Sequence, residues 1–131
     1  MASVSFQRIL KGNEVASLRF FRLCFWSSLA IIVLMVALPV WKLWPILQAQ
    51  EAVVPMHYNI HFGVDRTGPW WGIFILPGIG LAFLLLNAIF ALKLWKRERM
   101  LSYLFGGVTV AVEAILFVAM VFVVLLNLSY G

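Results

Sequence analysis

Three long runs of apolar residues limit what this chain can fold into more than any other feature. They cover about residues 23–44, 70–92 and 104–128, and their only charged residues are Lys42 and Glu113. A helix needs about 20 mostly apolar residues to cross the hydrocarbon core of a bilayer, so each run predicts one transmembrane helix. Of the 131 residues 64% are hydrophobic and 11% charged, too few polar side chains to cover a soluble domain. The predicted fold class is an all-α membrane protein with three transmembrane helices.

The basic residues predict the orientation of these helices. Four lie in residues 1–22 and four in residues 93–99, whereas only Lys42 and Arg66 fall on the opposite side. The positive-inside rule then places the N-terminus in the cytoplasm and the C-terminus outside. We expect residues 1–22 to form a basic amphipathic flank at the membrane surface and residues 23–131 to form one membrane domain. The net charge of +5 is explained by this topology and by anionic lipid, and nucleic-acid binding is not expected.

The first apolar run has two competing interpretations. A cleaved signal peptide has an apolar core of about 7–15 residues and a small-residue cleavage site. This run is longer, and it ends at Trp41-Lys42-Leu43-Trp44-Pro45, where tryptophans mark an interface and proline ends a helix. A retained signal-anchor helix is therefore predicted. Cys24, the single cysteine, excludes an intrachain disulfide and is interpreted as a small embedded side chain, with palmitoylation as the alternative.

Residues 55–65, between the first two runs, alternate between apolar and polar side chains, which is typical of a half-buried strand. One side of that strand would hold Tyr58, Ile60, Phe62 and Val64, and the other would hold His57, Asn59, His61 and Asp65. This is the one cluster of titratable side chains outside the predicted cytoplasmic flanks. The loop is therefore the first candidate for recognition, and the predicted partner-binding residues are His57, Tyr58, Asn59, His61 and Asp65.

The histidines of this loop raise the question of a metal site. On a strand, His57 and His61 would lie about 13 Å apart, too far to share one ion. A turn at Gly63 would let His57, His61 and Asp65 supply three ligands, a number that zinc sites use. The alternative is that these groups face water while the apolar side rests on the bilayer. The sequence holds no phosphate loop or metalloprotease, redox or hydrolase motif, so we predict no metal, no cofactor and no enzymatic activity.

Small and polar residues recur at helical spacing along each apolar run, which predicts the faces by which the helices meet. The three faces are Ser27, Ala30, Leu34, Ala37 and Trp41; Pro77, Gly80, Leu84, Asn87 and Ala91; and Gly106, Thr109, Glu113, Met120 and Asn127. Antiparallel pairing of the second and third helices would put Asn87 level with Thr109 and Glu113 near Gly80. Pro77 is expected to bend the second helix.

Glu113 lies about 14 Å along its helix, near the middle of the membrane. A carboxyl group at this depth is expected to stay protonated. It would serve as a neutral structural group bonded to Thr109, Asn87 or a backbone carbonyl, as a contact to a second protomer, or as a proton or ion relay.

Several residues of the loop carry a resemblance to a known family. Pro55, His57, Tyr58 and Asn59, followed by Gly63 and Asp65, resemble the Pro-x-His-aromatic-Asn…Gly…Asp signature of SdpI-type small integral-membrane proteins. The chain has one residue more between Asn59 and Gly63 than that signature. The resemblance covers about residues 23–92 and implies a bacterial inner-membrane protein. Some relatives confer immunity to a secreted toxin and signal its presence.

These observations predict a non-catalytic recognition or accessory protein that acts through residues 55–65 and contacts the bilayer and a protein partner or a second copy of itself. The alternative function is a small oligomeric channel or proton-linked transporter that uses Glu113.

Overall fold

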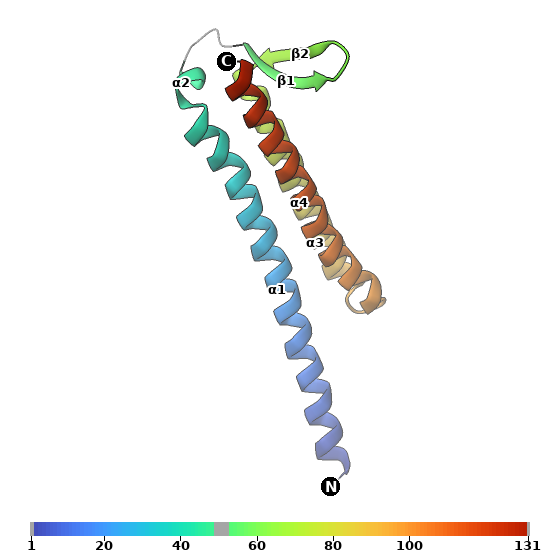
Figure 1. Ribbon diagram of the computed structural model, residues 1–131. Coiled ribbons are helices and arrows are strands. Elements are labelled where there is room, and N and C mark those ends of the chain that lie inside the picture. The colour runs from blue at the N-terminus through green and yellow to red at the C-terminus, as the bar shows by residue number, and fades with distance from the viewer. Residues whose placement is uncertain (1, 49–52, 131) are drawn as a thin grey trace.

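The structure is a computed structural model that describes residues 2–48 and 53–130. The elements in order are α1 (Ala2–Lys42), α2 (Trp44–Leu47), β1 (Val53–Asn59), β2 (Gly63–Pro69), the 3-10 helix η1 (Trp70–Phe74), α3 (Ile75–Leu94) and α4 (Arg99–Tyr130). Three long helices pack against one another, and Figure 1 shows the short helix α2 and the β1–β2 hairpin at the end where the C-terminus lies.

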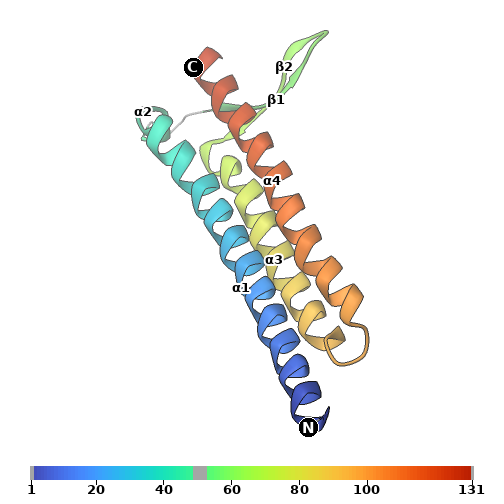
Figure 2. The same cartoon turned by 60° about the horizontal axis from the view of Figure 1, so that its bottom comes forward.

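Within the described residues, three segments are long and apolar enough to cross a membrane: Glu14–Lys42, Trp70–Leu94 and Arg99–Ser129. The predicted fold class is therefore confirmed, including a strand-containing loop between the first two spans. Residues 2–22 continue into the first span as one helix, and α4 begins five residues before the predicted start of its span. Helix α4 packs against both α1 and α3, which also contact each other (Figure 2).

Prolines mark two helix ends. Helix α1 ends at Lys42, and Pro45 stands in the first turn of α2, where a missing N–H costs no helical hydrogen bond. Pro77 is the third residue of α3, so it also occupies a first turn. The 3-10 helix η1 runs directly into α3, so Pro77 lies two residues after the change of helix type, and a bend at Pro77 stays a prediction.

The buried faces of α3 and α4 are those that the sequence predicts. All five predicted residues of α3 are buried, and so are Gly106, Thr109, Glu113, Met120 and Asn127 of α4. Small residues on this seam allow close approach, because a Cβ atom added at Gly106 would lie 3.2 Å from the Phe20 ring of α1.

The predicted face of α1 is wrong. Ser27, Ala30, Leu34, Ala37 and Trp41 are all exposed, and the buried residues described in α1 are Ser17, Ser28, Ile32, Met35 and Pro39. The buried face of α1 therefore includes large side chains that pack against small residues of α3 and α4. Met35 reaches Gly80 of α3, where an added Cβ would lie 3.2 Å from Cε of Met35.

Residues 55–65 form most of an antiparallel hairpin instead of the single predicted strand. Asn59 pairs with Gly63 across a turn of three residues. The Asn59 Oδ1 atom accepts a hydrogen bond from the backbone N–H of His61 at 2.9 Å, and Gly63 has a positive φ of 76°. An asparagine that caps its own turn and a glycine in the left-handed region are typical of three-residue hairpin loops.

Candidate functional site

The hairpin brings together two of the predicted partner-binding residues. Nδ1 of His57 in β1 lies 2.6 Å from Oδ1 of Asp65 in β2. The sequence placed both residues on one side of a strand, but their contact depends on the turn between them. Both side chains are exposed, so the pair contributes at most about 1 kcal/mol to stability. Its role is to hold the orientation of the imidazole ring.

The tip of the hairpin is apolar. Ile60 and Phe62 flank His61 in the turn, and each is 82% exposed. The Asn59 side chain accepts a hydrogen bond from the His61 backbone N–H, so Asn59 sets the shape of the turn. Of the predicted binding residues, His61 is the one that the structure places at the tip itself.

The base of the hairpin is fastened to the membrane-spanning helices. Val54 of β1 is fully buried in the hydrophobic core. The side-chain amide of Asn127 in α4 donates to the backbone carbonyl of Pro55 at 2.7 Å and to that of Val123 at 2.8 Å. A buried amide that bonds a strand carbonyl fixes both position and angle. The hairpin is therefore fixed to α4 at its base, and the hydrogen bond from His61 to Asn59 shapes its turn.

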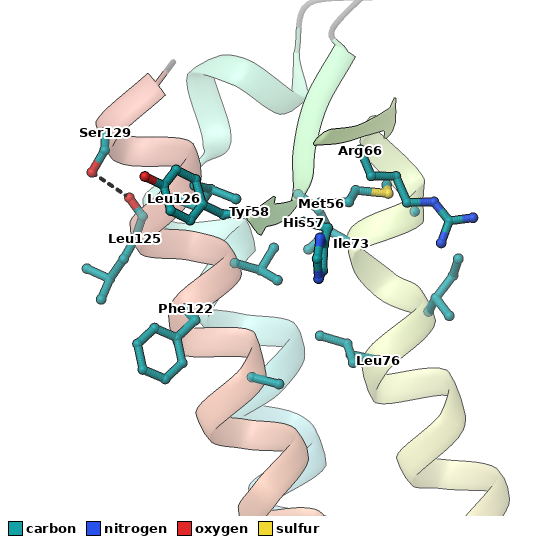
Figure 3. Close-up of a pocket in the computed structure, with 14 residues that line it drawn as sticks. Met56, His57, Tyr58, Arg66, Ile73, Leu76, Phe122, Leu125, Leu126 and Ser129 are labelled. Carbon is teal, nitrogen blue, oxygen red and sulfur yellow. Dashed lines mark hydrogen bonds between the residues drawn. The ribbon is translucent and has the colours of Figure 1, made fainter. Parts of the chain in front are cut away.

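A pocket of about 820 Å³ lies between the hairpin, the first residues of α3 and the last turns of α4. We call it the hairpin pocket, and its lining includes Met56, His57, Arg66, Leu76, Ala119 and Phe122. Figure 3 shows the His57 imidazole between α3 and α4, with Tyr58 beside Leu126 of α4. His57 and Tyr58 therefore belong to this pocket rather than to the tip.

Met56 forms part of the pocket's upper wall because two glycines leave room for it. A Cβ atom added at Gly68 would lie 2.9 Å from the Met56 sulfur, and one added at Gly72 would also collide with that side chain. The thioether is a flexible apolar group that adapts to the shape of what it contacts.

The described residues contain no group of three or more His, Cys, Asp or Glu side chains that could hold a metal ion. His57 binds Asp65, while His61 lies in the turn, so the turn does not gather the three ligands.

The predicted polar residues within the membrane lie on facing helices. Asn87 of α3 donates to the Thr109 hydroxyl of α4 at 3.0 Å, which agrees with the prediction that the two residues lie at the same height along their antiparallel helices. Thr109 in turn donates to the backbone carbonyl of Phe105 at 2.6 Å. This pair is satisfied without Glu113.

Glu113 is fully buried, and within the described part of the chain neither of its carboxyl oxygens has a hydrogen-bond partner. The expected bond to Thr109, Asn87 or a backbone carbonyl is not formed, because Asn87 and Thr109 bond each other. Gly80 of α3 makes the space, since a Cβ added there would lie 2.5 Å from Oε2 of Glu113. An unpartnered carboxyl at this depth is stable only when protonated.

Sequence reasoning missed three contributors to these sites. The sequence analysis used Arg66 only as one of two basic residues on the side of the membrane with fewer positive charges, yet it lines the hairpin pocket. Met56 fell outside the alternating pattern. Ser102 donates a hydrogen bond to the Ala91 carbonyl at 2.5 Å, and nothing in the sequence indicated this beyond its position on the buried side of α4. Gly68 and Gly72, which leave room for Met56, were the usable sign of close packing in this part of the chain.

Comparisons with protein-family models, with curated proteins and with solved structures found no match to this chain.

Proposed function

We propose that this chain is a non-catalytic recognition or accessory protein of a bacterial inner membrane, and that it contacts a protein partner through the tip of its hairpin. The observation that carries the proposal is the pair Ile60 and Phe62, each 82% exposed on a turn whose shape is fixed. Large apolar side chains held out on a rigid support are typical of the anchors that dominate protein interfaces.

The support for the tip is what separates it from an ordinary loop. Asn59 and Gly63 set the turn, the pair His57–Asp65 joins the strands, and Asn127 fixes the base to α4. A surface that is ordered before binding loses less conformational entropy when it binds.

The proposed orientation puts the hairpin outside the cytoplasm. The ring centroids of Phe21 in α1 and Trp95 after α3 lie 5.3 Å apart, so Arg19, Arg22 and the basic residues 93–99 share one end of the bundle. Arg8 and Lys11 lie outside the residues whose side chains are described. The positive-inside rule assigns the end with most basic residues to the cytoplasm. The resemblance to SdpI-type proteins is compatible with this role and stays a prediction.

The test is site-specific photo-crosslinking in cells. A photoreactive amino acid in place of His61 should give a discrete protein adduct. The same photoreactive amino acid in place of Thr67, which is exposed toward the other end of β2, should give none. The adduct should disappear when Ile60 and Phe62 are both changed to serine at equal membrane levels. Adducts with lipid alone, or a protein adduct that survives the double substitution, would refute the proposal.

A second candidate function, an oligomeric channel or proton-linked transporter, is favoured by one observation. Glu113 is a fully buried carboxyl without a hydrogen-bond partner among the described residues, and ionisable residues within membranes commonly belong to proton or ion pathways. Proton flux in proteoliposomes tests it, as argued in the Discussion.

A further inference from the structure

We propose that the hairpin pocket binds one anionic phospholipid of the surrounding leaflet, with an acyl chain between α3 and α4 and the phosphate at Arg66. This site is separate from the apolar tip, and the inference does not depend on the proposed partner.

The lower part of the pocket is made for a hydrocarbon chain. Leu76, Ala119, Phe122 and Leu126 line it, and all four belong to segments that are apolar enough to span a membrane. A volume of about 820 Å³ lies within the range of pockets that enclose small ligands. Figure 3 shows Leu76 directed from α3 toward the space beside α4. At this depth the molecules that reach the pocket are lipids.

The upper part of the pocket lies at the level of the lipid headgroups. Trp70 and Trp71 begin η1, the 3-10 helix that leads into α3, and both are exposed; tryptophans gather at the membrane–water interface. His57 and Arg66 come from the hairpin above that level and line the same pocket. Apolar walls below and polar groups above match the two parts of a phospholipid.

The charge at the rim selects an anion. Arg66 is exposed and forms no salt bridge within the described part of the chain. Its neighbour Asp65 is bound to His57 and is not among the residues that line the pocket. Lys42, the other basic residue at this end, lies over the Trp41 ring with Nζ 4.1 Å from its centroid. A guanidinium offers paired donors whose geometry suits a phosphate.

The first arm of the test measures which lipid stays on the protein. The purified full chain is delipidated in detergent and given equal amounts of phosphatidylglycerol and phosphatidylcholine with identical chains, and native mass spectrometry counts the retained lipids. The wild type should retain one phosphatidylglycerol in preference. Arg66→Gln should lower that preference by about tenfold, the loss expected for one charge-assisted contact, whereas the matched control Lys42→Gln should keep it.

The second arm tests the acyl chain. Ala119→Phe places a ring in the pocket, and Ala114→Phe adds the same ring to an exposed position of α4 outside the pocket's lining. Only the first substitution should reduce retention of phosphatidylglycerol. Glycerophosphoglycerol, the headgroup without chains, should not displace the bound lipid at millimolar concentration, and displacement would mean a site for soluble anions and would overturn the proposal.

A third arm needs no variant and so does not depend on how a variant folds. Phosphatidylglycerol with a photoreactive group in its chain is incorporated into proteoliposomes with the wild type, and the labelled peptides are mapped. Label should concentrate in residues 73–76 and 119–126. Even labelling of all lipid-facing helices would overturn the proposed site. In the first arm, a preference for phosphatidylglycerol that is unchanged in Arg66→Gln, or that falls equally in Lys42→Gln, would also overturn it.

Discussion

The side-chain amide of Asn87 donates a hydrogen bond of 3.0 Å to the hydroxyl of Thr109, joining α3 to α4 inside the membrane. Because the same hydroxyl donates to the Phe105 carbonyl, it acts as acceptor and donor at once. Lipid offers neither function, so a polar group on this seam must find its partner within the protein. The pair therefore fixes how α3 and α4 are aligned along their length.

Removing the Thr109 hydroxyl should weaken this alignment. Thr109→Val keeps the shape of the side chain and leaves Asn87 without its acceptor, so we expect a loss of about 1 kcal/mol in unfolding free energy. Unfolding in mixed micelles measures it. Thr109→Ser retains the hydroxyl and is the control, and equal stabilities of the two variants would show that the bond contributes nothing.

A methyl group at Gly80 should strain the buried seam. Its Cβ would lie 2.5 Å from Oε2 of Glu113 and 3.2 Å from Cε of Met35, and overpacking of this kind costs about 1–3 kcal/mol. Thermal melts should show Gly80→Ala less stable than the wild type. Gly78→Ala is the matched control, since nothing lies within 4 Å of its added Cβ. Adding Glu113→Ala to Gly80→Ala should restore part of the lost thermal stability. Equal melting temperatures for Gly80→Ala and Gly78→Ala would show that the Glu113 carboxyl moves aside freely.

The bond from Asn127 to the Pro55 carbonyl should control the order of the hairpin. Asn127→Leu removes a donor worth about 1 kcal/mol, so amide hydrogens of β1 should exchange roughly fivefold faster while those in the middle of α3 are unchanged. Hydrogen–deuterium exchange read by mass spectrometry measures both. Ser129→Ala is the control, because the Ser129 hydroxyl bonds the Leu125 carbonyl of its own helix. Unaltered exchange in β1 of Asn127→Leu would contradict this role.

The sequence predicted α3 and α4 well because polar and small residues are rare in an apolar run and stand out at helical spacing. Asn87, Thr109 and Glu113 marked the faces that must avoid lipid, and their level followed from antiparallel pairing. Helix α1 offers only an ambiguous marker, because Ser27 and Ser28 are adjacent and only Ser28 is buried. Its other core residues, such as Met35 and Ile32, are as apolar as the residues that face lipid. Its buried face is decided by fit against Gly80 and Gly106, which no pattern within α1 reveals.

The site was predictable only in its local parts. Alternation in residues 55–65 correctly indicated extended structure, and Asn59 with Gly63 contained the signal for a turn that would have changed one strand into two. The hairpin pocket had no local signal. It arises because Met56 and Arg66 of the hairpin meet Leu76 and Phe122 of different helices, and such meetings depend on the whole fold.

The orientation of the spans can be measured directly. A reporter fused after Gly131 should be active only outside the cytoplasm, and one inserted near Glu98 only inside, because the positive-inside rule predicts that the basic residues around Glu98 lie in the cytoplasm. A pair of reporters, each requiring one compartment, reads both positions. Activity in the opposite compartments would contradict the proposed orientation and would place the hairpin inside.

The role of Glu113 can be decided by changing its proton without changing its shape. Glu113→Gln retains a donor and nearly the same volume, so a structural Glu113 predicts a change within about 1 kcal/mol in unfolding free energy. Glu113→Leu removes every polar atom, and because the carboxyl has no partner to lose among the described residues, this variant should be as stable as the wild type or more so. Thermal melts of both variants in the same detergent measure this.

A proton relay predicts a different outcome from the same two variants. The glutamine amide neither ionises nor takes up a proton in the physiological pH range, so Glu113→Gln would fold normally and lose proton flux. Flux is measured in proteoliposomes under a pH gradient and a membrane potential, with Thr109→Ser as a control that alters the neighbouring face but keeps the carboxyl. An active wild type beside an inactive Gln variant of normal stability would favour the transporter over recognition through the hairpin. Zero flux in the wild type under both driving forces would remove the transporter and leave Glu113 as a neutral group that fills the space beside Gly80.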